Sequence, residues 1–208
     1  GTSALLLVAF ESAHVPVDAE ATEARELVSD AGGTVQPSTR SAETWRDSFL
    51  RAPYLRDAMV QFGLINETFE TAITWDRFEE FVEQIRHTTT AALVGAGCGT
   101  TPLVSCRLTH VYPDGAAPYF TVIAAGRPGH ERLSQWAEVK GAAMDAIAEL
   151  GGTVTHHHAV GRDHRPGYDR QVPPPFQAVL RAAKSALDPS WVLNPGVLVD
   201  REKGDAIQ

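Results

Sequence analysis

Apolar and polar residues follow each other along the first third of the chain in stretches typical of both strands and helices. Leu5–Phe10 is a continuous apolar run, which predicts a strand covered on both faces. Residues 18–31 predict a helix with acidic early turns that ends at Gly32-Gly33. A second helix is expected from Ser41 and should break at Pro53, with a short helix over residues 54–62 after it.

The middle of the chain predicts strands as well as a helix. Residues 65–73 read as a strand, and Thr74 is a suitable N-cap for a helix over 75–88. Residues 103–112 and 119–125 predict two strands joined by the turn Pro113-Asp114-Gly115. The glycine-rich stretch 95–99 follows a helix and enters a strand, the reverse of a phosphate-binding loop, so we expect a plain connection.

The last third predicts a long helix over 131–150, a strand leading into three histidines, and a polar loop over 162–170. A final helix over 176–187 precedes an irregular tail. The sum is an α+β fold: a mostly antiparallel sheet with helices packed on one side. We expect one domain over residues 1–199 and a polar tail over 200–208. The abrupt start at Gly1-Thr2-Ser3 suggests a fragment of something longer.

Composition excludes several classes of protein. The net charge of −8 without a basic cluster argues against nucleic acid and anionic membranes as main partners. No apolar run is long enough to span a bilayer, and no signal peptide is visible, so we expect a cytoplasmic protein. Cys98 and Cys106 are too few for a disulfide framework or a four-cysteine zinc site and are expected to be reduced thiols.

Three consecutive histidines, His156, His157 and His158, are the most informative candidates for chemistry. Buried imidazoles need partners for their ring nitrogens, so three together are costly in a core. Imidazoles also titrate near neutral pH, which suits them to proton transfer. Glycines on both sides allow tight turns, and the pattern predicts a functional loop at a strand end. In an extended segment, His156 and His158 would lie on one side and His157 on the other.

Three segments, in this order, carry a resemblance to a known family. They are Phe69–Asp76 (FETAITWD), Ser105-Cys106-Arg107, and the histidine triplet followed by Val160-Gly161. Together they resemble the C-terminal half of the alkyldihydroxyacetonephosphate synthases and their bacterial relatives, which are FAD-linked oxidases of the vanillyl-alcohol-oxidase type. The tail Leu187–Gly196 is similar to the closing segment of the wider oxidase family. The resemblance implies a ferredoxin-like cap domain whose N-terminal FAD-binding domain is absent from this chain.

The resemblance also implies roles for single residues. In synthase-like members the acyl group of an acyl-dihydroxyacetone phosphate is exchanged for a fatty alcohol, in ether lipid synthesis, and the flavin N5 acts as a covalent electrophile. By position, Tyr119 matches the catalytic tyrosine, Arg56 a substrate-binding arginine, and His156–His158 the essential histidine segment. Asn194 opens a C-terminal segment important for activity and is a candidate contact to FAD.

The chemistry of these residue types agrees with those roles. Removing a proton from a substrate carbon needs a positioned base, which a tyrosine or a His–Tyr pair can supply. The planar guanidinium of Arg56 suits a phosphate or a carboxylate. Arg107 lies inside an apolar strand, where a buried guanidinium needs either a structural ion pair or a place in the active site. We expect Tyr119, Arg56 and the triplet to converge on one cavity that faces the FAD domain.

Further expectations follow from that interpretation. The isolated chain should be inactive and should bind FAD weakly or not at all. An exposed apolar surface should mark where the FAD domain docks. The substrate is expected to be a small molecule or a lipid; a lipid would bring the protein to a membrane surface peripherally. A homodimer is compatible with the sequence.

Three other functions remain open at this point. One is the cap of an FAD-dependent hydroxy-acid or alcohol oxidase or dehydrogenase, which the general-oxidase character of Asn194-Pro195-Gly196 favours. Another is a zinc-type site built from His156, His158 and His164, although we expect no dedicated metal site. The last is a non-catalytic ferredoxin-like binding module.

Overall fold

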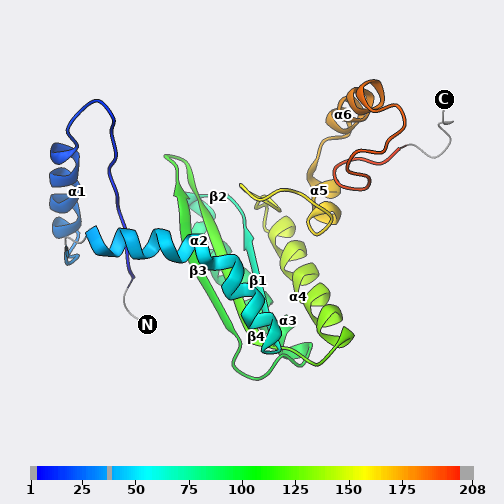
Figure 1. The fold of residues 1–208 in the computed structure, drawn as a ribbon, viewed down its shortest axis with the longest axis horizontal. Helices are drawn as coiled ribbons and strands as arrows, with labels where there is room; N and C mark the ends of the chain where they lie inside the picture. The colour runs from blue at the N-terminus through cyan, green and yellow to red at the C-terminus, as the bar shows by residue number, and fades with distance from the viewer. Residues whose placement is uncertain (1–3, 37–38, 202–208) are drawn as a thin grey trace. The chain divides into compact units, whose positions relative to one another are not determined.

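A computed structural model describes residues 4–36 and 39–201 of the chain. The helices and strands labelled in Figure 1 are, in chain order, α1 (Asp18–Asp30), α2 (Thr39–Gln61), β1 (Leu64–Glu70), β2 (Ile73–Thr74), α3 (Phe78–Gly95), β3 (Leu103–Val111), β4 (Gly115–Ala125), α4 (His130–Glu149), α5 (Arg165–Gln171) and α6 (Pro174–Leu187). A 3-10 turn, η1 (Trp75–Arg77), lies between β2 and α3. The chain divides into two compact units, residues 1–57 and 58–208, and α2 crosses the boundary between them.

The first unit corrects two predictions. Residues 4–10 form no strand, and the side chain of Leu5 is 87% exposed. A strand needs a neighbour for its backbone N–H and C=O groups, and the described part of this unit offers only helices. The expected break at Pro53 is also wrong, because α2 runs through it. The proline removes one hydrogen bond, while the helical residues on both sides keep theirs.

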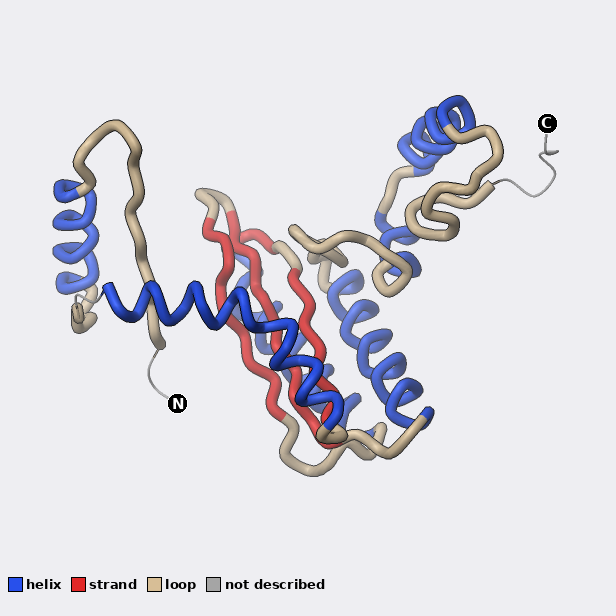
Figure 2. Tube along the Cα trace, viewed as in Figure 1, coloured by secondary structure: helices blue, strands red, loops and turns tan. Residues whose placement is uncertain are grey.

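The second unit is built on an antiparallel sheet, drawn red in Figure 2. β4 is central and pairs with β3 on one side and with β1 and β2 on the other. The predicted hairpin between β3 and β4 is confirmed. β4 begins at Gly115 rather than Tyr119, because residues 115–118 also pair with neighbouring strands. The α+β class with an antiparallel sheet is therefore confirmed.

The two faces of this sheet have different environments. Alternate side chains of β1 and β4, among them Phe69, Phe120 and Val122, are buried in the core with α3 and α4. The Phe69 and Phe120 rings stack with centroids 5.1 Å apart. We call this the helix face, and the opposite side, which carries Tyr119, the open face. The prediction that helices pack on one side holds for the described contacts of this sheet with α3 and α4.

The segment after α4 departs from the prediction in two places. Residues 153–158 form no strand, although two backbone hydrogen bonds hold them to Glu70 at the end of β1 and to Ala72 just after it. The predicted polar loop contains the short helix α5, whose Gln171 side chain bonds the backbone of Gly152 and Val154. The tail after α6 is irregular, as predicted. Among the described residues, no helix is long and apolar enough to cross a membrane.

Candidate functional site

A row of three side chains crosses the open face of the sheet. Glu70 on β1 and Arg107 on β3 both lie directly opposite Tyr119 on the central strand. Directly opposed residues of an antiparallel sheet share a face, so the three side chains project together. Arg107 is exposed rather than buried in the strand, and its guanidinium carbon lies 4.2 Å from the centroid of the Tyr119 ring. For Arg107, expected either in a structural ion pair or in the active site, the structure shows a cation–π contact on the open face.

The histidine triplet lies in a loop fixed beside this row. The amide of Thr153 donates to the carbonyl of Ala72, and the amide of His156 donates to the carbonyl of Glu70, at 3.2 and 3.1 Å. His157 adopts a φ of +55°, a left-handed conformation that is uncommon outside glycine. This turn, rather than strand alternation, sets the position of His157, whose ring lies with its centroid 4.4 Å from that of His156.

His164 anchors the far end of this loop. Its Nδ1 lies 3.1 Å from the carbonyl oxygens of both Ala159 and Val160, so Nδ1 carries the proton and donates. Burial lowers the pKa of His164, and the nearby Lys140 lowers this pKa further. We interpret His164 as a structural residue of the loop.

Glu70 is the centre of the site and is 3% exposed. Its Oε1 accepts hydrogen bonds from the Thr109 hydroxyl at 2.7 Å and from Nδ1 of His156 at 2.9 Å. Its Oε2 lies 3.7 Å from Nε2 of His158. Burial alone raises the pKa of the Glu70 carboxyl, but the hydrogen bonds from His156 and Thr109 and the two nearby imidazoles hold this pKa below its ordinary value. The site therefore stabilises the ionised form of the Glu70 side chain.

A bulge in β3 brings two further groups to Glu70. The pairing of β3 with β4 shifts between Leu108 and His110, so Thr109 has no directly opposite residue on β4. Bulges turn a side chain away from its regular direction, and here Thr109 reaches the carboxylate. Nδ1 of His110 lies 3.4 Å from the same Glu70 oxygen.

The first and last histidines of the triplet, His156 and His158, each contact a tyrosine. Nε2 of His156 lies 3.2 Å from the hydroxyl of Tyr112. The ring of His158 meets the ring of Tyr119 edge-on, with centroids 5.5 Å apart. The site thus contains two carboxylate–imidazole–phenol arrangements that share Glu70.

Three histidines of the site stand close enough to be considered as metal ligands. One ring nitrogen from each of His110, His156 and His157 lies within 4.8 Å of the other two. The rings of His110 and His157 are stacked, with centroids 4.2 Å apart. This group differs from the set considered from the sequence, because His164 is engaged with backbone carbonyls.

The structure brings together five of the seven candidate residues: Tyr119, His156, His157, His158 and Arg107. Arg56 is exposed on α2 in the first unit, so its expected convergence with the others stays a prediction. Asn194 is exposed in the tail with a φ of +44°, and no described contact joins it to the histidines. Its contact to a cofactor also stays a prediction.

Sequence reasoning missed four residues of the site: Glu70, Thr109, His110 and Tyr112. A signal was present for three of them. Glu70 is a carboxylate at the end of a strand that carries Phe69, where a buried charge needs partners. His110 and Tyr112 are two residues apart and therefore favour a common face. The role of Thr109 depends on the bulge, which the sequence does not reveal.

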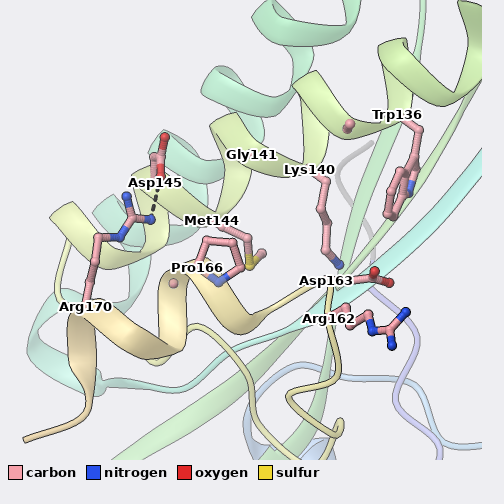
Figure 3. A pocket seen from close by; sticks show the side chains of 11 residues that line it. Trp136, Lys140, Gly141, Met144, Asp145, Arg162, Asp163, Pro166 and Arg170 are labelled. Atoms are coloured by element: carbon pink, nitrogen blue, oxygen red, sulfur yellow. Dashed lines mark hydrogen bonds and ion pairs between the residues drawn. The ribbon is translucent and has the colours of Figure 1, made fainter. Parts of the chain in front are cut away.

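A groove with a volume of about 400 Å³ lies between α4, α5 and the loop before α5 (Figure 3). Its charged lining includes Lys140, which pairs with Glu67, and Arg170, which pairs with Asp145. None of the histidines of the triplet lines it. Lys140 and Arg170 are thus already paired with carboxylates.

The chain as a whole is similar to known proteins. The family described as "FAD linked oxidases, C-terminal domain" matches residues 1–198. The chain is 28% identical over 191 residues to alkyldihydroxyacetonephosphate synthase of Caenorhabditis elegans, covering 92% of this chain and 32% of that protein. It is 28% identical over 195 residues to the synthase of Trypanosoma brucei brucei, covering 94% of this chain and 31% of that protein.

A solved alkyldihydroxyacetonephosphate synthase structure has a similar fold, with a TM-score of 0.58 and 17% identity. It matches 89% of this chain and 28% of the solved chain. The chain thus spans about a third of the length of the curated relatives that it matches.

Proposed function

The chain belongs to the C-terminal domain family of the FAD linked oxidases, and we propose that it is the substrate-binding and catalytic cap of an FAD-dependent enzyme of the alkyldihydroxyacetonephosphate synthase type. The reaction proposed is the exchange of an acyl group on dihydroxyacetone phosphate for an alkyl group. The observation that carries the proposal is the cluster on the open face, where Tyr119, Arg107 and the histidine loop surround the buried carboxylate of Glu70.

The residues of this chain fit one side of a flavin site. The open face offers phenol and imidazole groups, which can hold or move protons, and an exposed guanidinium suited to an anionic group. The chain's glycine-rich stretch, residues 95–99, joins α3 to β3 and is not a phosphate cradle. We therefore assign FAD binding mainly to an N-terminal domain of the same protein. When bound, FAD supplies the electrophilic centre of the reaction.

Exposed apolar side chains give that domain a surface to pack against. On α6, Phe176, Val179 and Leu187 are 54%, 68% and 87% exposed. On α2, Trp45 and Phe49 are exposed and stack on each other. Apolar surface of this kind marks interaction sites.

The work of the cap in this reaction is proton transfer and positioning. A base must remove a proton from the substrate, and Tyr119 with His158 beside it is one such group. Arg107, which lies over Tyr119, is proposed to attract the phosphate of the substrate, and its exposed guanidinium supports this role. Arg56 is proposed as a second phosphate contact on the resemblance alone.

The test is an assay of the complete FAD-containing protein with acyl-dihydroxyacetone phosphate and a labelled fatty alcohol. The proposal expects a labelled alkyl product without net oxygen consumption. Substrate-dependent flavin reduction with oxygen consumption, and no alkyl product, would instead identify a hydroxy-acid or alcohol oxidase. Tyr119→Phe and His158→Ala should each reduce the rate on the order of 10²–10⁴-fold, and unchanged rates would indicate a binding module.

A zinc-type site is the second candidate, favoured by the grouping of His110, His156 and His157. Zinc binds imidazole nitrogens at about 2.0–2.1 Å, so ligand atoms at the outer limit of 4.8 Å would have to move closer. Nδ1 of His156 bonded to a carboxylate is also the usual outer support of such a ligand. Metal analysis after dialysis tests this function: one ion per chain that His157→Ala abolishes would support it.

A further inference from the structure

Glu70 lies beside two histidine–tyrosine pairs, and in only one of them is the tyrosine hydroxyl hydrogen-bonded to the histidine. Tyr112 lies within hydrogen-bond distance of His156, whereas Tyr119 touches His158 through ring edges. Within residues 4–36 and 39–201, the Tyr119 hydroxyl has no hydrogen-bond partner. Tyr112 is thus a second phenol in position for proton transfer, beside the Tyr119 that the resemblance indicates.

The direction of the hydrogen bonds follows from the charge of Glu70. A carboxylate only accepts, so Nδ1 of His156 must carry a proton and donate it. A neutral His156 then has a lone pair at Nε2, and the Tyr112 hydroxyl donates to it at 3.2 Å. This order of carboxylate, imidazole and hydroxyl is the one that activates a hydroxyl oxygen in hydrolytic triads.

The surrounding structure fixes each residue of this hydrogen-bonded series. Glu70 is buried, and Thr109 holds the same oxygen that accepts from His156. The backbone of His156 is tied to the backbone of Glu70. The carbonyl of Tyr112 accepts from the indole N–H of Trp75, and its amide donates to Gly115 across the hairpin. Tyr112 itself is 38% exposed, so its hydroxyl can reach a bound molecule.

We propose that Tyr112, His156 and Glu70 form a proton relay of the cap, an inference that rests on the function proposed above. The Tyr112 oxygen takes a proton from the substrate while its own proton passes to Nε2 of His156. Glu70 is the positioning residue: it fixes the tautomer of His156 and stabilises the imidazolium. The proton returns by the same route in the second half of the reaction, so no electron or leaving group is involved in this step.

The experiment compares phenol variants in the complete FAD-containing protein, using the alkyl-exchange assay. Tyr112→Phe should lower kcat on the order of 10²–10⁴-fold with little change in KM. Tyr168→Phe, on α5, is the matched control and should leave the rate unchanged. FAD content and thermal midpoint show whether each variant is folded.

Chemical rescue separates proton transfer from a structural role. His156→Ala should be nearly inactive, and added imidazole should restore part of the rate with wild-type Tyr112 but not in the double variant with Tyr112→Phe. Glu70→Gln, which keeps the shape but not the charge, should lower kcat at least tenfold while Glu67→Gln on the other face does not. Rescue that persists without the Tyr112 hydroxyl contradicts the relay.

The experiment distinguishes failure of the relay from failure of the proposed function. A wild-type rate that survives Tyr112→Phe overturns the relay alone. A wild-type protein that makes no alkyl product overturns the proposed function and the relay with it. Loss of rate in Tyr112→Phe with imidazole rescue of His156→Ala supports both.

Discussion

Glu67 and Glu70 are the same residue type on the same strand, yet they face opposite sides of the sheet. Glu67 lies on the helix face, where Nζ of Lys140 is 2.9 Å away and Trp136 donates to the other carboxylate oxygen. Glu70 lies on the open face, where its partners are a hydroxyl and imidazoles. A permanent cation fixes the first carboxylate, whereas partners that gain and lose protons surround the second. The difference supports the proposal that the helix face is structural and that the open face carries the chemistry.

The largest effect on stability is expected at the helix face. Lys140→Met leaves Glu67 buried without its cation, and breaking such a pair costs about 3–5 kcal/mol. The two side chains are 6% and 11% exposed, so solvent screens the pair little. Urea unfolding measures the loss. The double variant with Glu67→Leu should recover most of it, because no unpaired charge is then left; a loss below about 1 kcal/mol in the single variant would show that the pair is solvated.

A smaller loss is expected when the carboxylate of the open face is removed. Glu70→Ala leaves Nδ1 of His156 and the Thr109 hydroxyl without their acceptor, which costs about 1–3 kcal/mol. In the same urea experiment, Glu70→Ala should lose less unfolding free energy than Lys140→Met. If Glu70→Ala proved the more destabilising of the two, the assignment of the open face to chemistry would lose its basis.

Acid should weaken the fold partly through Glu70. Its pKa in the folded chain lies below the ordinary value of 4.5, so its contribution to stability is complete above pH 4.5 and is lost as the pH falls through the folded pKa. Glu70→Gln should therefore flatten the dependence of unfolding free energy on pH below 4.5. Asp188→Asn is a control at another carboxyl whose pKa is lowered, mainly by a hydrogen bond from Lys184, and should leave the Glu70 contribution in place.

The smallest effect is expected at His164, which supports the loop without joining its chemistry. Burial lowers the pKa of this imidazole below 6.5, so protons bind the unfolded chain more readily. The contribution of His164 to stability is complete above pH 6.5 and is lost as the pH drops from 6.5 toward its pKa in the folded chain. His164→Asn keeps an N–H for the carbonyls and should remove this slope, while the exposed His87→Asn should not. A slope that survives His164→Asn would place its origin in another group.

The β3–β4 hairpin and the helices α1, α4 and α6 could be predicted because their signals are local: periodic apolar residues, a turn motif, and glycine or proline at the ends. The strand at Leu5–Phe10 and the strand before the histidines could not. Whether an apolar run becomes a strand depends on a partner that supplies hydrogen bonds, and the run itself does not contain that information.

By itself, the sequence determined the fold class and the family resemblance, and it singled out the histidine triplet as a candidate site. These are properties of residue types in order along the chain. Only the tertiary structure decided that Glu70 lies at the centre, that a bulge places Thr109 against it, and that Tyr112 rather than Tyr119 is hydrogen-bonded to a histidine. Those contacts join residues up to 86 positions apart, and they depend on register and on the turn at His157.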